Sequence, residues 1–118
     1  QKTDDPYNGW QIYQDSGHPG HLDMRITQQN NFLTNATIAA GKWTYATFVR
    51  KGGSTYWYLN GALDASGFNA ASISDPGAFY IGYAPTWTAF YDGALDDVRI
   101  YSRALSPQEI AQLYAAGK

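Results

Sequence analysis

The feature that most constrains this chain is a series of short segments in which apolar and polar side chains alternate. The clearest covers residues 21–27, where Leu22, Met24 and Ile26 share one face and polar residues share the other. A period of two is that of a β-strand with one buried face. Turn-forming pairs separate these segments: Asp5-Pro6, Asn8-Gly9, Pro19-Gly20, Gly52-Gly53, Asn60-Gly61, Pro76-Gly77 and Asp92-Gly93. The pattern predicts many short antiparallel strands.

We predict strands over residues 9–15, 21–27, 43–50, 54–60, 78–84 and 94–102, with weaker ones over 31–37 and 68–73. The Gly52-Gly53 pair predicts a hairpin between the strands over 43–50 and 54–60. In the strand over 54–60, we expect Trp57 and Leu59 to face the core. We expect Tyr56 and Tyr58 to line the opposite, concave surface. We also expect Trp10 and Trp43 to lie in the core.

One helix is predicted near the C-terminus. Ser106 begins a capping-box sequence that ends at Glu109, with proline at the first helical position. Apolar residues follow at helical spacing, and Gly117 is a typical stop. A helix of about ten residues is not stable alone in water, so it must dock on the sheets.

Composition excludes several classes of protein. The chain has 118 residues, the length of one domain, and we expect residues 1–118 to form a single unit. Its formal net charge of −2 gives no basic surface for nucleic acid, and we expect no such partner. It contains no apolar run long enough to insert into a membrane, and no cysteine for disulfides or thiolate metal sites.

The segment 90–114 carries a specific order of residues, FYDGALDDVRIYSRALSPQEIAQLY. It resembles the closing segment of laminin-G-like, concanavalin-A-like jelly-roll domains, and residues 41–45, 58–61 and 80–82 match the family's preceding landmarks in order. The resemblance implies an all-β fold, an antiparallel jelly-roll β-sandwich with one short C-terminal helix. It also implies carbohydrate binding or adhesion within a secreted or surface multidomain protein.

The resemblance further implies opening strands ahead of Gln1. A sandwich without them would expose apolar surface and unpaired edges. We therefore expect a second polypeptide, a neighbouring copy or an excised N-terminal piece to supply these strands. The alternative is a minimal sandwich whose own strands cover the gap.

Catalysis has little support in the sequence, and we expect no enzyme. Glycosidases use two carboxylates across a cleft. Glu109 is the only glutamate and belongs to the capping box, while Asp96 and Asp97 are adjacent and would point to opposite faces of a strand.

Carbohydrate binding needs a flat aromatic side chain against the C–H face of the sugar and polar partners for its hydroxyls. The predicted loop 83–91 contains Trp87 and Tyr91, which form either an exposed platform or a lid over the core. The predicted ligand-binding residues are Trp87, Tyr91, Tyr56, Tyr58, His18 and Asp15. The alternative function is a structural or assembly module, decorating a cell surface or virion, that contacts proteins through its sheet edges.

A metal site is the last expectation. Members of the resembled family often carry Ca²⁺, which takes oxygen ligands, and the candidates here are Asp97, Asp4 and Asp5. The other interpretation pairs Asp97 with Arg99 on the same strand face and leaves Asp4 and Asp5 in a solvated turn.

Overall fold

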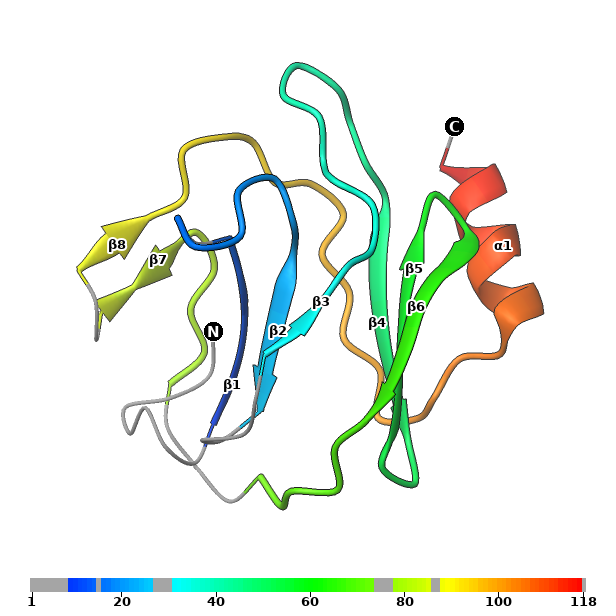
Figure 1. Cartoon of the computed structure of the whole chain (residues 1–118). Helices are drawn as coiled ribbons and strands as arrows, with labels where there is room; N and C mark the ends of the chain where they lie inside the picture. The colour runs from blue at the N-terminus through cyan, green and yellow to red at the C-terminus, as the bar shows by residue number, and fades with distance from the viewer. Residues whose placement is uncertain (1–8, 15, 27–30, 74–77, 86–87, 118) are drawn as a thin grey trace.

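The computed structural model describes residues 9–14, 16–26, 31–73, 78–85 and 88–117, and it is built of antiparallel strands and one helix (Figure 1). Its elements are β1 Trp10–Tyr13, β2 Asp23–Ile26, β3 Phe32–Leu33, β4 Ala46–Lys51, β5 Ser54–Leu59, β6 Ala62–Phe68, β7 Tyr83–Ala84, β8 Ala89–Phe90 and α1 Pro107–Ala116. The sheets are ordered β1-β2-β3, β4-β5-β6 and β7-β8. The all-β fold with a C-terminal helix is confirmed.

The first sheet follows from the alternation in the sequence. β1 pairs with β2 in the register that places Ile12 opposite Met24. Met24 and Ile26 are 5% and 2% exposed, as their shared face predicts. Trp10 packs against the same buried cluster, so its expected place at the core is confirmed.

Two tight turns build the second sheet. Gly52 and Gly53 close the β4–β5 hairpin with φ angles of 56° and 89°, and this predicted hairpin is confirmed. Asn60 and Gly61 close the β5–β6 hairpin in the same way, with φ angles of 50° and 79°. Two successive residues with positive φ suit the twist of paired strands. The turn at residues 60–61 was predicted, but the strand β6 that follows it was not.

The β4-β5-β6 sheet is covered on both faces. On one side Trp57, which is 1% exposed, packs with Met24 and Ile26, and its Nε1 donates to the Phe32 carbonyl at 2.8 Å. On the other side lies α1 (Figure 1), whose Ile110 packs in one cluster with Tyr58 of β5. Burial of neighbouring strand residues on opposite faces places this sheet at the centre of the molecule.

The helix begins as its sequence predicts. The Ser106 hydroxyl accepts a bond from the Glu109 N–H at 3.1 Å, and the Glu109 carboxylate accepts one from the Ser106 N–H at 3.1 Å. The Gly117 N–H donates to the Leu113 carbonyl and closes the last turn. In the described part of the chain, no helix combines the length and apolarity that crossing a bilayer requires.

Several expectations are corrected. Tyr58 is 7% exposed, because α1 docks on the face that was expected to be open. Trp43 is 67% exposed, because it lies in the connection before β4 and not in the strand that was expected to begin there. The predicted strand 78–84 is reduced to β7, and no strand forms beyond Phe68 in residues 69–73. The predicted strand 94–102 does not form: the segment has no strand assignment, and Asp97 within it has a φ of 52°, which a β-strand does not adopt.

Candidate functional site

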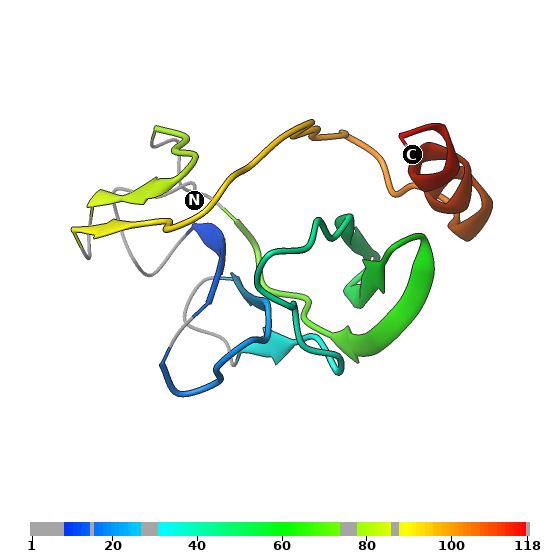
Figure 2. The ribbon, with the colours of Figure 1, turned by 90° about the horizontal axis from the view of Figure 1, so that it is seen from above.

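The β7–β8 hairpin lies at one end of the molecule, away from α1 (Figures 1 and 2), and aromatic side chains pack together on it. Its register places Tyr83 opposite Phe90, and their rings stack with centroids 4.8 Å apart and planes 30° apart. Cross-strand aromatic pairs of this kind stabilise a short hairpin. The Tyr91 N–H extends the pairing by donating to the Gly82 carbonyl at 2.9 Å.

We call Tyr80, Tyr83, Phe90 and Tyr91 the aromatic hairpin. Tyr80 packs edge-on against Tyr83 at a centroid distance of 6.2 Å. Phe90 is 76% exposed and Tyr91 is 46% exposed, so both present ring surface to solvent. The ring of Tyr91 lies over Gly93, where an added Cβ atom would come within 2.8 Å of it. The cluster therefore offers flat apolar faces held by ring–ring packing.

Three of the other predicted ligand-binding residues belong to other parts of the chain. Tyr56 and Tyr58 lie on β5, their rings 6.5 Å apart, and both pack in the cluster under α1. His18 is half-buried in the β1–β2 connection, where its carbonyl accepts a bond from the His21 N–H. Trp87 and Asp15 lie outside the described residues.

Sequence reasoning identified residues 83–91 as a loop and singled out Tyr91, but it missed the contribution of Tyr83 and Phe90. The structure shows a hairpin instead, with the Thr88 N–H donating to the Pro85 carbonyl across the turn. The signal that was available is the equal spacing of Tyr83 and Phe90 from that turn, which makes them cross-strand neighbours.

The predicted calcium ligands do not form a site in the described residues. Asp97 accepts bonds from Arg99 at both carboxylate oxygens, with distances of 2.8 and 3.3 Å. No three acidic or histidine side chains cluster in the part of the chain that the structure describes. Asp4 and Asp5 fall outside that part. Asp97 is thus bonded to Arg99, and because Ca²⁺ takes six to eight oxygen ligands, calcium binding by Asp97, Asp4 and Asp5 stays a prediction.

Two other carboxylates have structural partners. The pKa of Glu109 is lowered to about 2, first by its hydrogen bond with Arg103 and then by the Ser106 N–H. Asp64 accepts bonds from the backbone N–H groups of Asn35 and Ala36 at 2.6 and 3.1 Å, which ties β6 to the chain after β3. These bonds commit both side chains to holding the fold.

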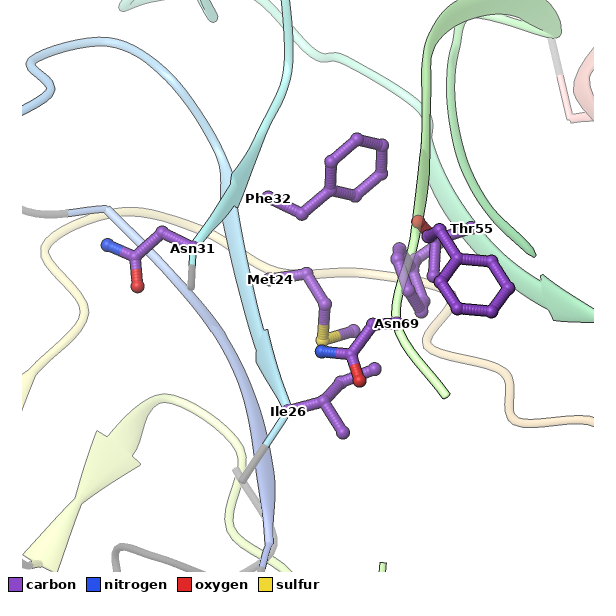
Figure 3. A pocket seen from close by; sticks show the side chains of 8 residues that line it. Met24, Ile26, Asn31, Phe32, Thr55 and Asn69 are labelled. Atoms are coloured by element: carbon purple, nitrogen blue, oxygen red, sulfur yellow. The ribbon is translucent and has the colours of Figure 1, made fainter. Parts of the chain in front are cut away.

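A small cavity lies between the two three-stranded sheets (Figure 3). Its volume is about 110 Å³. It is lined by Met24, Ile26, Asn31, Phe32, Phe48, Thr55, Phe68 and Asn69. Ligand pockets typically measure about 300–1,000 Å³, so this space is a gap in the packing of the sandwich.

Comparisons with known proteins agree with this architecture. The sequence model of the concanavalin A-like lectin/glucanase superfamily, in its laminin-G form, matches residues 2–111. A crystal structure of an S-layer domain-containing protein from Clostridium thermocellum is similar, with a TM-score of 0.56 and 22% identity. The alignment covers 97% of this chain but 66% of that one. At this identity the likeness concerns the fold alone.

Proposed function

Because the chain belongs to the concanavalin A-like lectin/glucanase superfamily, we propose that it is a non-catalytic module that binds carbohydrate on its aromatic hairpin. We further propose that it works at the cell surface or outside the cell. The description of the similar crystal structure as an S-layer domain-containing protein supports that location.

The exposed rings of Phe90 and Tyr91 are the observation that carries this proposal. A pyranose presents a patch of C–H groups that packs against an aromatic face, and its hydroxyls need polar partners beside that face. The exposed carboxylate of Asp92, next to Tyr91 in the chain, is one such partner. Neighbouring exposed aromatic side chains such as these form an apolar patch, and such patches mark interaction sites on soluble proteins.

The arrangement of carboxylates supports a module without hydrolytic activity. Glycosidases place two carboxyl groups roughly 5–9 Å apart across the scissile bond. Glu109 is bonded to Arg103 and to the cap of α1, Asp97 is paired with Arg99, and Asp64 accepts two backbone N–H groups. None of these three groups lines the cavity of Figure 3.

The proposal is tested by screening the chain on a glycan array and titrating the strongest ligand by calorimetry. We expect Tyr91→Ala and Phe90→Ala each to weaken binding by about tenfold or more, because loss of one aromatic contact is worth roughly 1–2 kcal/mol. Trp43→Ala is the matched control, because the exposed fraction of Trp43, 67%, lies between those of Tyr91 and Phe90 but the residue stands before β4. It should leave the affinity unchanged.

Absence of any glycan signal from the folded chain would overturn the proposal. Equal losses from Trp43→Ala and Tyr91→Ala would overturn the assignment to the hairpin. A chain that binds no glycan but forms a defined oligomer would favour an assembly module. Repeating the titration with EDTA tests whether Ca²⁺ takes part. A Trp87→Ala variant extends the test to the other aromatic residue that the sequence predicts as a ligand contact in the segment 83–91.

A further inference from the structure

The part of the sequence that forms the aromatic hairpin is acidic and contains no cation. Across residues 52–98 there is no lysine, arginine or histidine, although five of the ten acidic residues of the chain fall there. These five are Asp64, Asp75, Asp92, Asp96 and Asp97. Asp92 directly follows Tyr91, so a ligand on the hairpin rings meets a carboxylate and no cationic side chain of the same segment.

The carboxylate of Asp92 is exposed and has no neighbour that neutralises it. Among the described residues it makes no hydrogen bond and no ion pair. Asp97 differs, because it is paired with Arg99, and Glu109 is paired with Arg103. Asp92 is therefore available to pair with a cation that the ligand supplies.

The exposed rings of Phe90 and Tyr91 also favour a cation. The face of an aromatic ring is the negative part of its quadrupole and attracts an ammonium group within about 6 Å of the ring centroid. Phe90 is 76% exposed and Tyr91 is 46% exposed, so each ring offers surface to such a group. Neighbouring Cα atoms are about 3.8 Å apart and charges in physiological salt act over about 8 Å, so Asp92 attracts a cation held over Tyr91.

We propose that the ligand of the aromatic hairpin is an amino sugar that carries a free, protonated amine. The C–H face of the sugar packs on an aromatic ring, and the ammonium group lies beside that ring and pairs with Asp92. This inference rests on the proposed carbohydrate-binding function and adds the substrate class to it. An N-acetylated sugar packs in the same way but has no charge for Asp92 to attract.

Acidic glycans fit this surface poorly. Proteins recognise carboxylate groups mainly with arginine and lysine side chains, and residues 52–98 contain neither. Arg99 is the first basic residue after the hairpin, and it donates to both carboxylate oxygens of Asp97 at 2.8 and 3.3 Å. A sugar carboxylate on the hairpin would therefore face repulsion from Asp92 without a compensating partner in this segment.

Calorimetry with matched oligosaccharides tests the proposal. The probes are short oligomers of glucosamine and N-acetylglucosamine, the corresponding pair from galactosamine, and oligomers of galacturonic acid, in mildly acidic buffer that keeps the amines protonated. We expect an amino oligomer to bind about fivefold or more tightly than its acetylated counterpart, and the galacturonic acid oligomer to bind most weakly. The preference should shrink between about 0.01 M and about 1 M salt, because the screening length falls from about 30 Å to about 3 Å.

Three variants locate the preference. Asp92→Asn removes the charge and keeps the shape, so it should bring the ratio of the two affinities close to one. Asp96→Asn is the matched control: it changes net charge equally, keeps the Oδ1 that accepts from the Asp97 N–H, and lies in segment 94–101, which runs from the hairpin toward α1 (Figure 2). It should retain the preference. Phe90→Leu keeps an apolar side chain but loses the ring face, so it should reduce the preference.

The outcomes separate this inference from the function on which it rests. Equal affinities for the amino and acetylated oligomers, or binding of other glycans on the array but of none of these, would overturn the inference and leave carbohydrate binding standing. A preference that persists in Asp92→Asn, or is lost equally in Asp96→Asn, would also overturn it. No glycan binding at all would overturn both. Circular dichroism shows whether each variant is folded, and the salt-dependent preference of the unsubstituted chain decides the matter without any variant.

Discussion

Gly61 occupies a position where both the backbone and the neighbouring helix require glycine. Its φ of 79° is strained for other residues, and an added Cβ would lie 3.0–3.1 Å from the ring and the Cβ atom of Tyr114. Gly41 has a similar φ of 74° but nothing within 4 Å of such an atom. Alanine substitutions at Gly61 and Gly41 therefore separate the free-energy cost of backbone strain from the cost of displacing α1.

We predict that Gly61→Ala lowers the free energy of unfolding more than Gly41→Ala. The strain alone costs about 1–2 kcal/mol in either variant. Crowding against Tyr114 adds about 1–3 kcal/mol to the first, because the Cβ of Tyr114 cannot move without the helix. Urea denaturation followed by circular dichroism measures the free energy of unfolding of both variants. Equal losses would mean that α1 shifts freely at this contact.

Single residues also show where pattern-based reasoning stops. Tyr58 and Trp57 were assigned to opposite faces of one strand, and that alternation is correct. The sequence could not show that α1 covers the second face, because the docking of a helix depends on tertiary packing. Trp43, at the start of the predicted strand 43–50, was assigned to the core, and its exposure shows that a large apolar side chain is by itself weak evidence of burial.

At the scale of elements, local signals were reliable where they included specific chemistry. The capping box of α1 and the Gly52-Gly53 hairpin were predicted from residues whose backbone requirements are strict. β6 was missed because its sequence, with Asp64, Ser66 and Gly67, has low strand propensity. It forms a strand because the tight turn at residues 60–61 brings it back beside β5.

The capping box of α1 makes the free energy of unfolding depend on pH. The folded pKa of Glu109 is about 2, below the ordinary 4.5, so the folded state binds this proton less tightly than the unfolded state. The stabilisation from Glu109 is therefore complete above about pH 4.5 and is lost as the pH falls through the folded value. We predict that Glu109→Gln is less stable than the wild type at neutral pH and that the difference shrinks in acid.

Thermal unfolding between about pH 7 and about pH 3 measures this difference. Arg103→Gln is the control, because it removes the first cause of the lowered pKa and leaves the bonds between Ser106 and Glu109 in place. It should reduce the acid dependence without abolishing it. A constant difference between wild type and Glu109→Gln across this range would contradict the assignment.

At the scale of the whole molecule, the aromatic hairpin and segment 94–101 are the parts that sequence reasoning predicted least well. The aromatic hairpin depends on the register of two two-residue strands, which composition does not encode. Segment 94–101 has the strongest strand pattern in the C-terminal part of the chain, yet it has no ladder among the described residues. Strand formation requires a neighbour, and a single segment cannot specify one.

The β4-β5-β6 sheet separates two buried clusters. This arrangement predicts whether the stability effects of two substitutions add. Ile26 belongs to the cluster between the sheets, whereas Ile110 and Val49 share the cluster under α1. Ile26→Val and Ile110→Val should each cost about 0.5–1.5 kcal/mol and should add within about 0.5 kcal/mol, because β5 lies between them. Val49→Ala combined with Ile110→Val should deviate from additivity, since both reshape one cluster. Urea denaturation of the single and double variants measures each sum. Additivity inside the second cluster, or coupling across the sheet, would mean that the two faces do not pack as independent cores.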